Sequence, residues 1–250
     1  MKQAIGAAVA AVNPQCRFDR AIFVIGHMRC GSTALAHVLC SHAAISGYGE
    51  AHVAYRSAAA LGVLTVNQLR RRAWKPSAGR LFDKILHSRY DGAPADSFFD
   101  STAIFLIREP EPAIASIRSL FDGKREYETD ADAARYYADR LAGMMTLWQR
   151  FAPDRRIGLT YRQLTDAPDH WLQRISRCAG LPTPLVNQYR VRGVRAGEGA
   201  GDPSASRFAS IVPWQKTKLH HASSATLALE PTTLDALAAQ YRELCGIFSK

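Results

Sequence analysis

The amino-acid sequence predicts an α/β fold in which a mainly parallel sheet is flanked by helices. Residues 21–25 and 103–107 are short apolar runs rich in β-branched and aromatic side chains, as is typical of strands covered on both faces. A segment whose apolar residues have helical spacing follows each run. Because strands and helices alternate along most of the chain, we expect ligands to bind at the carboxyl ends of the strands.

The composition fits a single folded domain that spans residues 1–250. Hydrophobic residues make up 47% of the chain and charged residues 22%, which excludes a largely disordered or fibrous protein. The formal net charge of +10 predicts an anionic partner. The five cysteines include no Cys-x-x-Cys pair, so we expect reduced thiols and a cytoplasmic location. No apolar run has the length that a membrane-spanning helix needs.

The first third of the chain is expected to hold one strand and two helices. Residues 1–20 form an N-terminal extension, whose Ala-rich start indicates a frayed or helical segment. The first strand covers residues 21–25 and ends at a glycine. Residues 32–39 repeat apolar side chains at helical spacing, and residues 51–69 are rich in Ala and Leu, which favours a second helix.

The middle of the chain continues the alternation. We expect strands at residues 81–87, 103–107 and 156–161, because apolar residues dominate each segment. Residues 112–121 are expected to form a helix, since a proline at the start suits the first helical turn. Residues 130–151 carry methionine and aromatic side chains at helical spacing, which predicts a helix that faces the core.

The last part of the chain begins with a change of composition. Residues 182–210 are rich in Gly, Pro, Ser and Arg, which predicts a long flexible loop. Residues 232–247 then close the chain as an amphipathic helix.

The turn after the first strand has the frame of a phosphate-binding loop. Gly26 and Gly31 have the Walker A spacing, but Ser32 occupies the position of the lysine that would reach the β and γ phosphates of ATP. Arg29 supplies the cation of the turn instead. Backbone N–H groups, a helix N-terminus and the hydroxyls of Ser32 and Thr33 can still hold a phosphate. The turn therefore predicts an anion site, but this site lacks the lysine that hydrolysis of a magnesium–nucleotide complex requires.

A second candidate anion site follows the strand at residues 103–107. Arg108 ends this strand, and Ser116 lies eight residues further along, on the next helix. An arginine and a serine in these positions can hold a second phosphate together. In order and separation, the two sites resemble the two cofactor motifs of the sulfotransferase family, which uses 3′-phosphoadenylyl sulfate (PAPS). The resemblance implies the fold of the P-loop-containing nucleotide hydrolases.

The resemblance also implies which residues bind each part of the cofactor. The family's loop that binds the 5′-phosphosulfate is matched in this sequence by Arg29, Cys30, Gly31, Ser32, Thr33 and Ala34. Arg108 and Ser116 match the pair that binds the 3′-phosphate. Tyr161 and Lys216 lie in segments similar to the family's Tyr-Glu-Asp-Leu element and to its late Trp/Lys element, which closes over the nucleotide. PAPS is then the co-substrate, adenosine 3′,5′-bisphosphate (PAP) is the product, and no metal is required.

The sequence departs from the family pattern at two positions. Glu111 lies where family members often carry a second basic residue, although Arg118 follows further along the helix. Gln163 replaces the acidic residue expected after Tyr161. Both departures bear on the contacts with the nucleotide more than on the class of enzyme.

Four residues are candidates for catalysis. Sulfuryl transfer needs cations near the sulfur and the leaving phosphate, and a base at the acceptor hydroxyl. Arg29 fits the first role, and so does Lys84, which resembles the family lysine that contacts the sulfuryl group. Glu50 lies in a segment similar to the one that carries the glutamate base of tyrosylprotein and some carbohydrate sulfotransferases. His87 is the rival base, because some soluble family members use a histidine near the matching strand.

The nature of the acceptor stays open. The Glu50 segment and the basic charge favour tyrosine in an acidic peptide, and a carbohydrate or glycolipid hydroxyl is the alternative. A P-loop kinase is a further alternative, although Ser32 disfavours it. A nucleic-acid-binding module would explain the arginine run at residues 70–72 and Trp74. As a sulfotransferase, the protein would need neither nucleic acid nor a membrane span, and a homodimer is compatible with the sequence.

Overall fold

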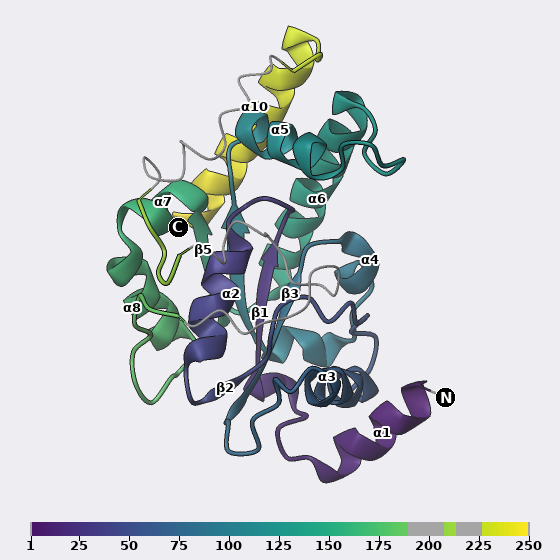
Figure 1. The fold of residues 1–250 in the computed structure, drawn as a ribbon, viewed down its shortest axis with the longest axis vertical. Helices are drawn as coiled ribbons and strands as arrows, with labels where there is room; N and C mark the ends of the chain where they lie inside the picture. Colours follow the sequence, from purple (N-terminus) through teal and green to yellow (C-terminus); the bar gives the residue numbers. More distant parts are fainter. Residues whose placement is uncertain (1, 190–207, 214–226, 250) are drawn as a thin grey trace.

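A sheet of five parallel strands forms the centre of the molecule. The computed structural model describes residues 2–189, 208–213 and 227–249. The strand order is β2-β3-β1-β4-β5, and helices lie on both faces of the sheet (Figure 1). The strands are β1 (Ala21–Gly26), β2 (Ile45–Ser46), β3 (Arg80–Ile85), β4 (Thr102–Ile107) and β5 (Arg156–Thr160). The predicted α/β fold with a parallel sheet is confirmed.

The two faces of the sheet are covered by different helices. The longer helices that follow β1 are α2 (Ser32–Ser41), α3 (Ala59–Arg70), α5 (Pro110–Leu120), α6 (Asp130–Arg150), α8 (Pro168–Cys178) and α10 (Pro231–Phe248). Phe23 and Phe105 point to one face and pack in a cluster with α3, α5, α6 and α10. Val24 and Leu106 point to the other face and pack with α2, α8 and the short α7 (Tyr161–Asp166). Because successive strand residues alternate between two buried faces, β1 and residues 103–107 of β4 are apolar throughout.

The strand register brings the carboxyl ends of three strands to one edge. Val24 of β1 pairs with Lys84 of β3 on one side and with Ile104 of β4 on the other. The segments that follow β1, β3 and β4 therefore leave the sheet side by side. Both predicted anion sites lie on these segments.

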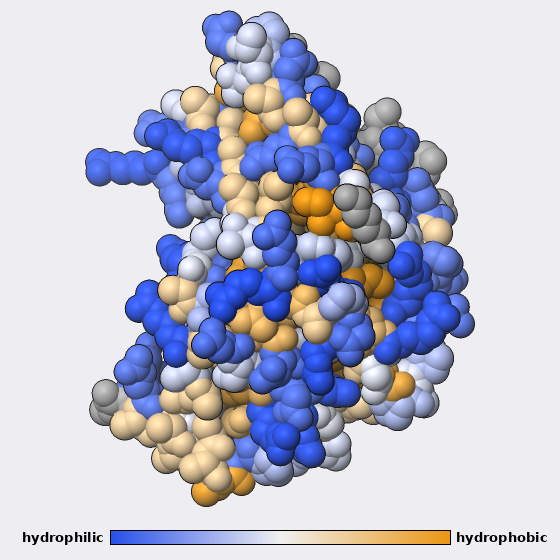
Figure 2. All heavy atoms as spheres, turned by 180° about the vertical axis from the view of Figure 1, so that it is seen from behind, coloured by the Kyte–Doolittle hydropathy of each residue, from blue (hydrophilic) through white to orange (hydrophobic). Residues whose placement is uncertain are grey.

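The N-terminal segment is helical and attached to the rest of the domain. Helix α1 (Lys2–Val12) crosses α3 closely, since a Cβ atom added at Gly62 would lie 1.8 Å from the carbonyl oxygen of Gly6. Gln15 then bonds to the Ala78 carbonyl and accepts the indole N–H of Trp74. Figure 2 shows that apolar residues gather at the lower left of the back view, where α1 lies.

Some elements differ from those expected. Helix α3 begins at Ala59 instead of near residue 51, because the backbone of the preceding segment bonds to distant groups: the Ala51 N–H donates to Asp83, and the Tyr55 N–H donates to the Tyr90 carbonyl. Four elements have no counterpart among those predicted from the sequence: β2, α7, α8 and the short helix α4 (Ser88–Asp91). No helix within the described ranges is long and apolar enough to cross a membrane.

A buried arginine ties the carboxyl ends of β1 and β3 together. Arg140 of α6 donates from Nε to the Gly26 carbonyl at 2.8 Å and from Nη2 to the Ile85 carbonyl at 3.0 Å. It also forms a bidentate pair with Asp91 of α4, at 2.7 and 2.8 Å. Both side chains are only 1% exposed. The pair therefore holds two strand ends and α4 in one arrangement.

Replacement of Arg140 by methionine should lower the free energy of unfolding by about 3–5 kcal/mol, because Asp91 would stay buried without its cation. Urea denaturation followed by circular dichroism measures the loss. Arg135→Met is the control, since Arg135 pairs with Asp132 at the surface of the same helix and should contribute less than about 1 kcal/mol. Equal losses in the two variants would contradict a special role for Arg140.

Candidate functional site

The turn between β1 and α2 has a strained backbone. Arg29 adopts φ 65°, a left-handed conformation that is unfavourable for a residue with a Cβ atom. Gly31 adopts φ 89°, and a Cβ atom there would lie 2.5 Å from the ring of Tyr161. Strain of this kind is found at binding sites, where the surrounding structure holds it in place.

His27 joins this turn to the end of β4. Its Nδ1–H donates to the Met28 carbonyl at 2.7 Å, and its Nε2 accepts the backbone N–H of Arg108 at 2.9 Å. The ring is fully buried, and burial lowers the pKa of His27 to about 3. The imidazole is therefore neutral, and both of its nitrogens are engaged in linking the two predicted anion sites.

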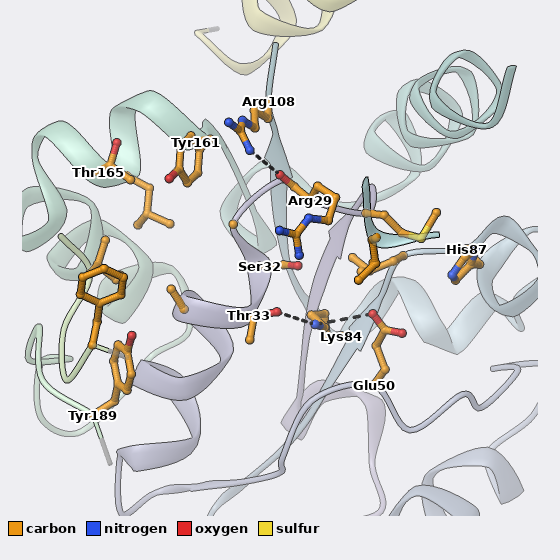
Figure 3. A pocket seen from close by; sticks show the side chains of 18 of the residues that line it. Arg29, Ser32, Thr33, Glu50, Lys84, His87, Arg108, Tyr161, Thr165 and Tyr189 are labelled. Atoms are coloured by element: carbon orange, nitrogen blue, oxygen red, sulfur yellow. Dashed lines mark hydrogen bonds and ion pairs between the residues drawn. The ribbon is translucent and has the colours of Figure 1, made fainter. Parts of the chain in front are cut away.

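The two predicted anion sites are in direct contact. The Arg29 side chain donates from Nε to Ser116 Oγ of α5 at 2.8 Å, and Arg108 donates from Nη1 to the Arg29 carbonyl at 3.2 Å. The Arg108 guanidinium also lies 4.7 Å from the centre of the Tyr161 ring. In Figure 3, Arg108, Arg29 and Lys84 follow one another along the strand ends. Three cations and the N-terminus of α2 thus surround one position.

Lys84 connects the first loop to Glu50. The ammonium group is buried on β3, donates to Thr33 Oγ1 at 3.2 Å and lies 3.5 Å from Glu50 Oε1. Burial alone would raise the pKa of Glu50, but Lys84 and a hydrogen bond from His52 lower the pKa of Glu50 to about 2. Glu50 is therefore a carboxylate at neutral pH.

The segment that carries Glu50 is held by Asp83. This buried carboxylate accepts the Ala51 N–H at 2.8 Å and the hydroxyl of Tyr55 at 2.6 Å. The Lys84 N–H donates to the same carboxylate and the Asn67 side chain donates to the Ala51 carbonyl. Burial raises the pKa of Asp83 to about 7. These long-range bonds place Glu50 opposite Lys84 without a helix or strand.

His87 lies at the outer side of the same site. It follows β3 and precedes α4, and its ring lies 5.5 Å from that of Tyr136. Burial lowers the pKa of His87, an effect that Glu50 partly offsets. The structure thus brings both candidate bases, Glu50 and His87, to one side of the first loop (Figure 3).

These residues line a cavity of about 350 Å³ with two chemically different ends. One end, beyond Arg108, is lined by Tyr161, Leu164, Thr165, Tyr189, Phe208 and Ile211. The other end, beyond Lys84, is lined by Met28, Glu50, His52, Leu86, His87, Arg89, Leu120, Phe121 and Glu126. The loop residues Gly31, Ser32, Thr33 and Ala34 lie between the two ends. The cavity therefore offers chemically different surroundings on the two sides of the loop.

Most of the predicted site residues lie around this cavity. Cys30 does not line it, because its side chain is buried beneath the loop, so only its backbone could contact a ligand. Ser116 does not line it either, but it contacts Arg29, which does. Lys216 lies outside the residues that the structure describes.

The two departures from the family pattern have local explanations. Gln163 and Thr160 cap the N-terminus of α7, because the Gln163 side chain accepts the Thr160 N–H and the Thr160 hydroxyl accepts the Gln163 N–H. Glu111 is exposed in the first turn of α5, where a negative charge is favourable. Arg118 is bonded to Asp130, 3.1 Å away, and does not line the cavity.

The aromatic side chains at one end of the cavity were not predicted from the sequence. Tyr189 and Phe208 line the cavity, and in the sequence they lie on either side of the Gly-rich part of the predicted loop. The two sides of that part are hydrogen-bonded to each other, since the Tyr189 N–H donates to the Ala209 carbonyl. Aromatic residues at both ends of a glycine-rich segment were the available signal. His52 and Arg89 were also missed, because nothing in their sequence context distinguishes them from surface residues.

Within residues 2–189, 208–213 and 227–249, no group of three or more His, Cys, Asp or Glu side chains is arranged to hold a metal ion.

A family model describes part of the chain. The model of the "Sulfotransferase family" matches residues 65–184, a range that includes Lys84, Arg108 and Tyr161. No curated protein matches the chain.

Several solved structures of sulfotransferases have the same fold as this chain. The sulfotransferase domain from the curacin biosynthetic pathway is 18% identical with a TM-score of 0.60, and the match covers 88% of this chain and 96% of that domain. The corresponding domain of the Synechococcus PCC 7002 olefin synthase is 20% identical with a TM-score of 0.61, covering 89% and 94%. Mouse sulfotransferase SULT7A1, solved with PAP, is 12% identical with a TM-score of 0.52, covering 96% and 87%. At these identities the likeness is one of fold.

Proposed function

We propose that this chain, a member of the sulfotransferase family, transfers a sulfuryl group from PAPS to the hydroxyl group of an acceptor. The observation that carries the proposal is the contact between the two anion sites. Arg29, Arg108 and Ser116 are bonded together beside the loop at the N-terminus of α2, and Lys84 lies at the far side of the same loop. A ligand with two separate phosphate groups and a transferable sulfuryl group matches this distribution of cations.

The cofactor would occupy the loop and the aromatic end of the cavity. The backbone N–H groups at the start of α2, with Ser32 and Thr33, would hold the 5′-phosphosulfate. Arg108 and Ser116 would hold the 3′-phosphate, and we assign the Arg29 side chain to the same group, because it already donates to Ser116. The adenine would lie among the aromatic and apolar side chains that line this end of the cavity.

The other end of the cavity would bring the acceptor hydroxyl to the sulfur. The hydroxyl oxygen forms the new bond to sulfur, the bond from sulfur to the 5′-phosphate oxygen breaks, and PAP leaves with that electron pair. Lys84 would stabilise the charge that develops on the sulfuryl and phosphate oxygens. The proton of the hydroxyl passes to a base at this end.

Glu50 is the base that the geometry supports best. It is ion-paired with Lys84, which is bonded to the loop that would hold the phosphosulfate, whereas His87 lies further out. With a pKa of about 2, Glu50 is a weak base as long as no PAPS is bound beside Lys84. Bound PAPS would place negative charge beside Lys84, which weakens the attraction between Lys84 and Glu50 and makes Glu50 a stronger base.

The lining of the acceptor end favours an aromatic hydroxyl over a carbohydrate. Met28, Leu86, Leu120 and Phe121 provide apolar surface, which suits a phenol ring better than a polar sugar. Arg89, an exposed residue, lies at the mouth and suits an acceptor with nearby carboxylates. We therefore propose tyrosine in an acidic peptide as the acceptor class.

PAP should protect the protein against thermal unfolding more than ATP with magnesium. A ligand at 100 times its dissociation constant stabilises the folded state by about 2.7 kcal/mol, or about 5–10 °C for a domain of this size. Differential scanning fluorimetry measures the shift. Arg108→Ala should remove most of the PAP-induced shift, whereas Arg155→Ala, which removes an arginine bonded to the Asp100 carbonyl away from the cavity, should leave it unchanged.

Two outcomes would contradict the proposed cofactor. Equal or larger protection by ATP with magnesium would favour a kinase. Salt-sensitive binding to DNA without any protection by PAP would favour a nucleic-acid-binding module. Two residues that follow the arginine run have roles in the fold, since the Trp74 indole N–H donates to Gln15 and the Lys75 ammonium donates to the carbonyls of Cys40 and His42.

Glu50→Gln should lower turnover about 10²- to 10⁴-fold, the usual contribution of a general base, while PAP still binds. Release of PAP from PAPS measures turnover, first with water as the acceptor and then with a peptide that has one tyrosine among aspartates. The PAP-induced shift in melting temperature reports binding. Near-normal turnover would remove Glu50 from the role, and His87→Gln would then be expected to show the loss.

The tyrosine peptide should be sulfated with a higher kcat/KM than a disaccharide such as lactose, because only the peptide presents an aromatic ring to the apolar side chains of the cavity. Mass spectrometry detects the added sulfuryl group on each acceptor. A peptide with Phe in place of Tyr is the control and should gain no sulfuryl group. Preference for the disaccharide would overturn the proposed acceptor class and leave the sulfotransferase activity itself intact.

A further inference from the structure

His52 contacts the carboxylate of Glu50 from the side opposite Lys84. Its Nε2 lies 3.0 Å from Glu50 Oε2, while Lys84 faces Oε1 at 3.5 Å. An ionised carboxylate only accepts hydrogen bonds, so the His52 Nε2 must carry a hydrogen and donate it. Each oxygen of Glu50 therefore has one defined partner.

The backbone of His52 is strained. Its φ of 54° lies in the left-handed region, which is unfavourable for a residue with a Cβ atom. The preceding residue explains why the strain persists, since the N–H of Ala51 is bonded to Asp83 and its carbonyl accepts the side chain of Asn67. The conformation turns the imidazole back toward Glu50, two residues earlier in the chain.

An aromatic contact fixes the plane of the His52 ring. The ring stacks on Tyr90 with centres 5.5 Å apart and planes inclined by 18°. Tyr90 is held in turn, because its carbonyl accepts the Tyr55 N–H and its N–H donates to the His87 carbonyl. The Arg89 guanidinium lies 4.9 Å from the centre of the Tyr90 ring. His52 thus has one orientation although its side chain is 47% exposed.

We propose that His52 is a positioning residue for the reaction: its Nε2–H holds Glu50 Oε2, so that Oε1 takes the proton of the acceptor hydroxyl. This inference rests on the proposed function and adds to it the choice between the two carboxylate oxygens. When the bond from oxygen to sulfur forms, the hydroxyl proton moves to Oε1 and the hydrogen on His52 stays in place. A base held in this way needs no reorientation at the moment of transfer.

The test uses two substitutions that differ in the reach of one N–H donor. His52→Asn suits the left-handed backbone, since asparagine tolerates this conformation, but its amide is too short to reach Oε2. His52→Gln places its Nε2 where the imidazole Nε2 lies and keeps a donor there. His42→Asn is the matched control, because His42 is a partly exposed histidine bonded to Thr183 outside the cavity.

Release of PAP from PAPS is measured with water and with the acidic tyrosine peptide as acceptors. His52→Asn should lower kcat about 10- to 100-fold, as expected when a catalytic group is misplaced, with the KM for PAPS and the PAP-induced melting shift unchanged. His52→Gln should restore most of the rate, and His42→Asn should match the wild type. In a Glu50→Gln background, His52→Asn should cause no further loss, since the two residues act as one unit.

The outcomes separate this inference from the proposed function. A normal kcat in His52→Asn would overturn the positioning role while the base assignment stands. The same conclusion would follow if His52→Asn lowered kcat by the same factor in the Glu50→Gln background as in the wild type. Normal turnover in Glu50→Gln alone would instead overturn the proposed base. Loss of the PAP-induced melting shift in both His52→Asn and His52→Gln would also overturn the inference, because it would show that His52 supports the cofactor site and not Glu50.

Discussion

The buried pair of Arg140 and Asp91 is the interaction on which the site depends. Arg140 reaches from α6 across the end of the sheet and holds the last carbonyls of β1 and β3, while Asp91 neutralises its charge. Both ions are out of contact with water, so loss of either one leaves an unpaired buried charge. The loop after β1 and the lysine of β3 can be aligned only while these strand ends stay together.

His27 extends the same arrangement to β4. Its neutral ring bonds to the turn after β1 and to the backbone of Arg108, so hydrogen bonds within the protein join the two candidate anion sites. The cations that surround the loop are then preorganised for negative charge, as electrostatic catalysis requires. On the acceptor side, Asp83 serves a similar purpose for Glu50, since it holds the segment that carries this residue.

Sequence patterns predicted the strands β1 and β4 correctly, and indicated two candidate anion sites beside them, because these features are local. A buried parallel strand is apolar throughout, and a phosphate site needs a turn and a helix start within a few residues. The patterns failed for residues 51–58, whose Ala-rich composition favoured a helix, because bonds from Ala51 to Asp83 and from Tyr55 to Tyr90 hold the backbone in an irregular path. Helix α8 was not predicted, although its buried residues Trp171, Leu172 and Ile175 have helical spacing.

By itself, the sequence determined the parallel α/β class, the position of Arg29 in the turn after the first strand, the position of Arg108 at the end of a later strand, and the presence of Ser32 where a Walker A loop has its lysine. These follow from spacing along the chain. Only the tertiary structure decided that Arg29 turns to Ser116, that Glu50 is shared between Lys84 and His52, and that Tyr189 faces the cavity. Those contacts join segments far apart in sequence or depend on one strained residue, so neither composition nor periodicity could reveal them.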